Sequence, residues 1–149
     1  SSTTEPWFDS RSRRRIMNRH EVEVLIEKAD KAIVDEDFDT VMNFYTDDAM
    51  LVIRPDRIVH GKKDIRTAME KIAEFFKNSI GVEQRGMKVL EAGDTALVLA
   101  NTVITSSNFD DIVRQATYVF KKDPDKGWLC IIDNSLNQCN IYLLSILLE

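Results

Sequence analysis

Histidine and cysteine are scarce in this chain, and their scarcity excludes several kinds of site. The 149 residues include two histidines and two cysteines. Cys130 and Cys139 form no CxxC motif, and His20 and His60 lie far from each other and from any cysteine. Neither spacing is typical of zinc ligands or of a disulfide framework. We therefore expect no metal site, and we expect reduced cysteines in a cytoplasmic protein.

Long apolar runs and glycine-rich motifs are also missing. The most apolar segment, "IYLLSILL" at residues 141–148, is far shorter than the ~20 residues that a membrane-spanning helix needs. The five glycines form no GxGxxG motif, no phosphate-binding loop and no GxSxG motif. The sequence thus predicts no membrane span, no nucleotide cofactor and no serine nucleophile of the hydrolase type.

Positive charge is concentrated at the amino end. The formal net charge is −5, but residues 1–19 hold five arginines against two acidic residues, which leaves residues 20–149 at 15 minus 23, or −8. An acidic body is unfavourable for contact with a nucleic-acid backbone. We therefore expect no nucleic-acid partner, and we interpret residues 1–19 as a mobile basic arm that the fold does not need.

The remainder of the chain has the length and composition of a single domain, placed at residues 20–136. A chain of this size with 44% hydrophobic residues can bury a substantial core. Apolar residues at helical spacing predict a long helix from His20 to Asp35 and a short helix capped by Asp37. "TDD" is expected to end the short helix in a turn at Thr46–Ala49, and a third helix is expected to open at Gly61.

Two short strands and then four longer ones complete the predicted elements. The short ones are Met50–Ile53 and Ile58–His60, around Pro55, and an alternating pattern with turn residues between the runs predicts the rest: Val82–Glu91, Thr95–Thr105, Asp111–Lys121 and Trp128–Ser135. Short links favour an antiparallel meander, and helices before strands are typical of an α+β fold.

The order and spacing of three segments carry a resemblance to a known family. With "DFDTVMNFYTDDAML", "HGKKDI" and "GWLCIIDNS", the chain resembles the nuclear transport factor 2-like superfamily over about Glu21–Ser135, and is most similar to its SnoaL-like and DUF4440-type members. The resemblance implies a cone-shaped, cystatin-like fold in which a strongly bent antiparallel sheet packs on about three helices. It also implies an apolar pocket and frequent dimerisation through the outer face of the sheet.

The same resemblance allows a test for ketosteroid isomerase chemistry, which uses a carboxylate base with a tyrosine and a protonated acid as oxyanion donors. Laying the family's "YxDDA" on Tyr45–Ala49 puts the base at Ile53, the tyrosine at Ala29 and the acid at Tyr118. None of these residues supplies the expected group. The sequence therefore argues against that reaction, and Asp47 and Asp48 are interpreted as turn and capping residues.

Two residues are candidates for catalysis. Asp133 in "IIDNS" shares a strand face with Ile131, and a buried carboxyl group there would have a raised pKa suited to proton transfer. His60, before Gly61 at a strand end, is a candidate general base. Polar or aromatic side chains on apolar strand faces or near them are the candidates for a ligand pocket: Tyr45, Asn101, Gln115, Tyr118 and Trp128.

Two functions remain open at this point. The first is a domain that binds a small, mostly apolar organic molecule in a cone-shaped pocket, with proton-transfer chemistry of the isomerase or cyclase type as an option. The alternative is a non-catalytic module for homodimerisation or partner binding. In the predicted strands, apolar side chains occur at both the odd and the even positions, and residues 137–149 form an apolar extension. We therefore expect a homodimer, in which this extension lies at the interface or plugs the pocket.

Overall fold

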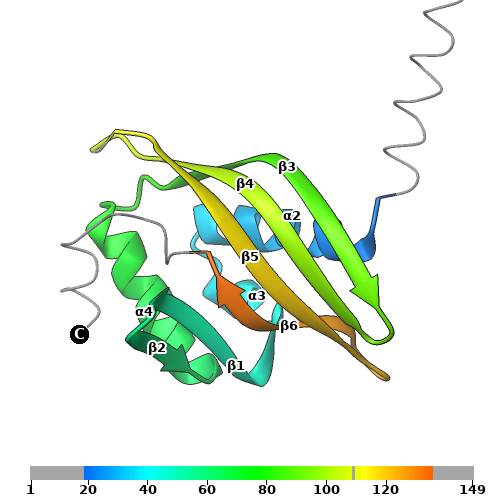
Figure 1. Ribbon diagram of the computed structural model, residues 1–149. Helices are drawn as coiled ribbons and strands as arrows, with labels where there is room; N and C mark the ends of the chain where they lie inside the picture. The colour runs from blue at the N-terminus through cyan, green and yellow to red at the C-terminus, as the bar shows by residue number, and fades with distance from the viewer. Residues whose placement is uncertain (1–18, 109, 136–149) are drawn as a thin grey trace, which may run out of the picture.

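Three helices pack on one face of a curled, open six-stranded sheet (Figure 1). The computed structural model describes residues 19–108 and 110–135. The helices are α2 (Glu21–Val34), α3 (Phe38–Met42) and α4 (Lys62–Phe75). The strands are β1 (Tyr45–Arg54), β2 (Arg57–His60), β3 (Gly81–Ala92), β4 (Thr95–Thr105), β5 (Ile112–Asp123) and β6 (Gly127–Asn134). This is the α+β, cystatin-like fold that the sequence predicts.

The long helix α2 forms where the periodicity predicts it. Its buried residues are Val22, Ile26, Ala29 and Ala32, at the spacing of one helix face. His20 caps it by accepting a hydrogen bond from the Val22 amide, while the Glu23 side chain accepts from the His20 amide. The prediction that Asp37 caps α3 is also confirmed, because its side chain accepts from the Thr40 amide.

The strand order is β2-β1-β6-β5-β4-β3. Strands β3 to β6 form the predicted antiparallel meander, and β1 and β2 form a hairpin. The expectation of a wholly antiparallel sheet is wrong at one place, since β1 runs parallel to β6. A parallel pair needs a long crossover, and here α4 and the meander provide it. As a result, the carboxyl end of β6 lies between β1 and β5.

The predicted turn at Thr46–Ala49 is also wrong, because these residues belong to β1. Tyr45 and Met50 both pair with β6, and this tertiary pairing carries the strand through the acidic residues between them. The register with β6 shifts between Tyr45 and Met50. Asp47 and Asp48 are exposed there, and Asp47 pairs with Lys62 across 3.4 Å. They therefore contribute nothing to the interior.

Two glycines provide backbone geometry that other residues rarely adopt. Gly61 has φ of 84° at the start of α4, and its amide donates to the Ala49 carbonyl, which ties the helix to β1. Gly86 has φ of 126° where the register of β3 against β4 shifts between Gln84 and Met87. Gly86 therefore marks a bulge inside a strand.

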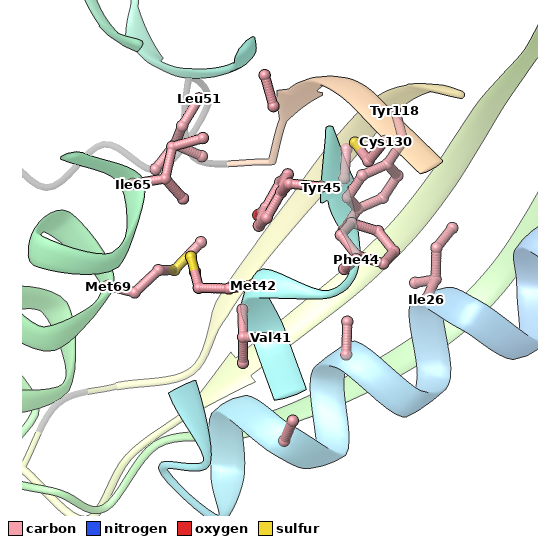
Figure 2. Close-up of a cluster of buried hydrophobic side chains, with 14 of the residues drawn as sticks. Ile26, Val41, Met42, Phe44, Tyr45, Leu51, Ile65, Met69, Tyr118 and Cys130 are labelled. Carbon is pink, nitrogen blue, oxygen red and sulfur yellow. The ribbon is translucent and has the colours of Figure 1, made fainter. Parts of the chain in front are cut away.

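The core lies between the concave face of the sheet and the helices. Figure 2 shows Tyr45 pointing into the middle of the cluster, with Met42 and Met69 on one side and Phe44 and Tyr118 on the other. Phe44 meets Tyr45 and Phe120 edge to face, with ring centroids 5.1 and 5.3 Å apart. The aromatic side chains of β1 and β5 therefore line the centre of the molecule.

Several predictions fall on residues that the structure does not describe. The basic arm lies outside the described residues except for Arg19, and the apolar extension at 137–149 and Cys139 lie outside them entirely. Cys130 is buried as a free thiol. In the described part of the chain, the helices are too short or too polar to cross a bilayer.

Candidate functional site

A small cavity of about 50 Å³ lies between the helices and the concave face of the sheet. Most of its wall is apolar and comes from all three helices, β3, β4 and the segments beside these elements: Ile26, Ala29, Ile33, Val41, Phe44, Met69, Ile72, Phe76, Ile80, Val82 and Ile104. Six polar side chains complete the wall: Asp30, Tyr45, Arg114, Tyr118, Asp133 and Ser135. An apolar pocket with a few convergent polar groups is the usual form of a small-molecule site.

Asp133 lies at the carboxyl end of β6, opposite Tyr118 on β5 and Leu51 on β1. It is 3% exposed. The Tyr45 hydroxyl donates to its Oδ2 at 2.5 Å, and the Ser135 amide donates to its Oδ1 at 3.0 Å. Burial raises the pKa of Asp133, although these hydrogen bonds and the positive charge of Arg114 oppose the rise. Both oxygens of this carboxyl group are therefore held by protein donors.

Asp30 faces the same cavity from α2. Its Oδ2 accepts a 2.7 Å hydrogen bond from Gln84 Nε2, and Gln84 Oε1 accepts in turn from Thr102 at 3.0 Å. Burial raises the pKa of Asp30 to about 6, against the lowering effects of Gln84 and Arg114. A carboxyl group with this pKa can gain or lose a proton near neutral pH, which is what a general acid or base requires.

Asp30 and Val82 also line a hollow on the surface between α2 and β3. The cavity and this hollow therefore share a wall. The cavity itself has room for only a few water molecules, so a larger ligand requires wall side chains to move. Val82 is only partly buried, which makes this wall the place where such movement disturbs the core least.

Arg114 supplies the positive charge of the cavity. It lies on β5 opposite Thr102 on β4, which itself pairs with Gln84 on β3, so the three residues form one inward row across the sheet. Arg114 is 7% exposed, and its Nε and Nη1 atoms have no hydrogen-bond acceptor among the described residues. Its charge lowers the pKa of both Asp30 and Asp133.

Three of the predicted site residues meet in the cavity, namely Tyr45, Tyr118 and Asp133. Burial raises the pKa of both tyrosine hydroxyls, so they stay neutral donors. Trp128 is buried but does not line the cavity; its ring meets His20 edge to face at 5.5 Å. His60 is exposed on β2 and lines a separate surface hollow with Asp64 and Lys71, away from Asp133.

Asn101 and Gln115 lie outside this cavity and line a separate hollow on the surface, so their predicted role in ligand binding stays a prediction. They pair with each other across β4 and β5, and both are exposed on the outer face of the sheet. The alternation of side chains identified correctly which residues share a face. It did not indicate which face the helices cover, because both parities of β4 are apolar.

The sequence analysis missed Asp30 and Arg114, although each carried a signal. Asp30 follows Ile26 by four residues and precedes Ile33 by three, which places it beside the apolar stripe of α2. It also directly follows Ala29, where the isomerase comparison expected a polar group. Arg114 alternates with Ala116 and Tyr118, so it shares the inward face of β5.

The chemistry available in the cavity is proton transfer and the binding of a polar atom in apolar surroundings. Within residues 19–108 and 110–135, no cluster of three or more histidine, cysteine or carboxylate side chains is arranged to hold a metal ion. The groups that can act are a carboxyl group with a pKa near neutral, a second carboxyl group held by two donors, two neutral phenols and an unpaired guanidinium.

Solved structures share this architecture. An NTF2-like protein with a cystatin-like fold from Novosphingobium aromaticivorans aligns with a TM-score of 0.70 and 17% identity, over 95% of this chain and 96% of that one. A candidate dehydratase of the NTF2-like family from Streptomyces avermitilis aligns with a TM-score of 0.61 and 20% identity, over 76% and 90%. A candidate calcium/calmodulin-dependent protein kinase association domain from Xanthomonas campestris gives 0.65 and 20%, over 81% and 88%.

These identities are low and establish the fold alone. No curated protein matches the chain. The family of SnoaL-like domains matches residues 22–130, which include all but the first residue of α2, the whole of α3 and α4, and all but the last few residues of the sheet. The chain therefore belongs to the SnoaL-like domains of the nuclear transport factor 2-like superfamily.

Proposed function

We propose that this domain binds a small, mostly apolar organic molecule in the cavity and transfers a proton to or from it. The observation that carries the proposal is an apolar cavity in which two carboxyl groups with raised pKa values face one buried arginine. Perturbed carboxyl groups in an apolar pocket are typical of functional sites, because burying them without a ligand to act on only costs stability.

Within this proposal the two carboxyl groups have different roles. Asp30 is the proton acceptor and donor, because its Oδ1 accepts no hydrogen bond from the described residues and its pKa is about 6. Asp133 fixes the Tyr45 hydroxyl, which lines the cavity and can position a ligand oxygen. The candidate dehydratase among the structural relatives is in keeping with proton transfer on this fold.

Ligand binding is tested by thermal unfolding of the protein with small neutral organic molecules such as cyclohexanone and benzyl alcohol. A ligand of the native state raises the melting temperature. The rise is expected in the wild type and in His60→Gln, whose side chain is exposed and remote, and is expected to shrink in Val82→Phe, which narrows the cavity at its partly exposed wall. An equal rise in Val82→Phe, or no rise with any compound, contradicts the proposal.

A second candidate function is homodimerisation or partner binding through the outer face of the sheet. Val113 is 70% exposed on β5 and Leu99 is 45% exposed on β4, and both belong to the face that the helices leave uncovered. Large apolar side chains on a sheet face are commonly covered in an assembly. This candidate does not exclude the first, because the two use opposite faces of the same sheet.

A further inference from the structure

Two nitrogen atoms of the Arg114 guanidinium lie in the cavity without a hydrogen-bond partner among the residues that the structure describes. Arg114 lines the cavity and is 93% buried, since 7% of it is exposed, and its Nε and Nη1 atoms find no acceptor within residues 19–108 and 110–135. Arginine stays charged in proteins, and a buried charge without hydrogen bonds is strongly unfavourable. The Arg114 guanidinium therefore needs a hydrogen-bond acceptor that the described residues do not supply.

Neither neighbouring carboxyl group takes this role. Asp133 uses one oxygen for Tyr45 and the other for Ser135, and Asp30 accepts from Gln84. Arg114 is close enough to lower the pKa of both carboxyl groups through its charge, yet no hydrogen bond joins it to either. The surrounding hydrogen bonds thus hold the carboxyl groups in place and leave the guanidinium donors available to a ligand.

We propose that the ligand of this cavity is a small apolar carboxylic acid, bound as its anion with the carboxylate on Arg114 and the hydrocarbon part against Ile26, Ile72 and Phe76. The inference rests on the proposed function, since it specifies the class of molecule that the same cavity binds. Guanidinium groups form their strongest hydrogen bonds with carboxylates, and a neutral oxygen would leave the buried charge without a counterion.

An anion next to Asp30 has a consequence for its protonation. The groups that face Asp30 are Gln84 from β3, Arg114 from β5, Asp133 from β6 and Glu27 on its own helix. Burial already raises the pKa of Asp30 to about 6, and a bound carboxylate raises it further by repulsion. Above pH 6 the ligand therefore binds together with a proton, and its affinity falls by up to about tenfold per pH unit.

Calorimetry with matched probes tests this proposal on the wild-type protein. Butyrate and benzoate are compared with butyramide and benzamide, which have nearly the same shape and no charge. Each carboxylate is expected to bind at least about tenfold more tightly than its amide at pH 6, because a charge-assisted hydrogen bond to a buried guanidinium replaces a neutral one. Equal affinities, or tighter binding of the amides, overturn the inference.

Two variants assign the effect to the named residues. Arg114→Met removes the charge at similar length and is expected to abolish the preference for carboxylates, while Arg114→Lys is expected to retain part of it. Asp30→Asn is expected to remove the pH dependence of the affinity for benzoate. If Arg114→Met does not fold, two measurements still test the inference: the affinities of the wild type for each acid and its amide, and the pH dependence of benzoate binding in Asp30→Asn.

The same data separate this inference from the proposed function. If the amides, cyclohexanone or benzyl alcohol bind and carboxylates are not preferred, the cavity is still a small-molecule site, but the inference that its ligand is a carboxylic acid is refuted. Failure of every probe, charged or neutral, to bind at millimolar concentrations refutes both. A preference for carboxylates that persists unchanged in Arg114→Met refutes the assignment to Arg114.

Discussion

At the scale of residues, Asp30 and Asp133 differ in how the protein holds them. Asp133 accepts from the Tyr45 hydroxyl and the Ser135 amide, whereas Asp30, among the residues that the structure describes, accepts from Gln84 alone. Hydrogen bonds to the ionised form of a carboxyl group lower its pKa, and burial raises it. Asp133 thus serves as a fixed acceptor for Tyr45, while Asp30 keeps an oxygen for exchange with a ligand or with solvent through the shared wall.

Asp30→Asn is expected to stabilise the protein above pH 6. The folded-state pKa of about 6 exceeds the ordinary value of 3.8, so the stabilising effect of protonation is complete below 3.8 and is lost as the pH rises through about 6. Asparagine carries no charge and can still accept from Gln84. We expect a gain of about 1–3 kcal/mol at pH 7.5 and a smaller difference at pH 4.5, measured by urea unfolding.

The control for this measurement is Glu21→Gln, which removes an exposed carboxylate from the first turn of the same helix. Its effect is expected to be small and nearly independent of pH. A variant Asp30→Asn that is less stable than the wild type at pH 7.5 would show that ionised Asp30 is satisfied in the folded protein. Asp30 would then not be available as the proton donor and acceptor of the proposed function.

At the scale of elements, the inward row of β3, β4 and β5 orients the polar groups of the cavity. Gln84, Thr102 and Arg114 are successive partners in the sheet register. Because the Thr102 hydroxyl donates to Gln84 Oε1, the amide nitrogen of Gln84 is directed toward Asp30. The Thr102 hydroxyl on β4 therefore influences the pKa of Asp30 on α2 through Gln84, although burial is the largest cause of the raised pKa.

Thr102→Val tests this arrangement with a side chain of nearly the same shape. Loss of the hydroxyl frees the Gln84 amide to rotate, and the lowering effect of Gln84 on Asp30 weakens. The pKa of Asp30 is then expected to rise above about 6, as measured by NMR titration of its carboxyl carbon. The unfolding free energy is expected to fall by about 1 kcal/mol, since Gln84 loses a hydrogen-bond donor.

Thr95→Val provides the matched control, because Thr95 lies at the exposed start of the same strand. It is expected to leave the pKa of Asp30 unchanged. An identical titration curve for Asp30 in Thr102→Val and the wild type would mean that Thr102 does not orient Gln84.

At the scale of the whole molecule, the sheet has one face covered by helices and one open face. The inward residues of β4, among them Val98 and Ile104, are buried, whereas Leu99 on the open face of β4 is 45% exposed and Val113 on the same face of β5 is 70% exposed. Burial of such side chains in an interface stabilises an assembly by roughly 1.5–3 kcal/mol for each one fully buried. We therefore keep the expectation of a homodimer as a prediction.

Val113→Glu is expected to dissociate such a dimer, because it replaces an apolar side chain on the open face of the sheet by a charged one. Light scattering at several protein concentrations measures the mass. Val24→Glu serves as the control, since Val24 is 50% exposed on α2 and lies on the other side of the molecule. A wild-type protein that is monomeric at all concentrations refutes the dimer. Dissociation by Val24→Glu as well would show that the effect of Val113→Glu does not locate the interface on the open face.

The sequence by itself determined the helices, most of the strands and the family. Apolar residues recur at the period of a helix in 20–35 and at the period of a strand in 95–121, and those periods depend only on local geometry. Asp133 and Tyr118 could be found in the same way, as polar or aromatic groups on an apolar face. Such patterns specify what lies on a common face of one element.

Only the tertiary structure decided which face is inward and which distant residues meet. Arg114 and Gln115 are adjacent in sequence and point to opposite sides of β5, and the packing of α2, α3 and α4 on one side alone makes the first a cavity residue and the second an exposed one. Pairing of β1 with β6 likewise turned a predicted acidic turn into a strand and brought Tyr45 to Asp133. Both outcomes depend on contacts between residues far apart in the chain, which local periodicity does not encode.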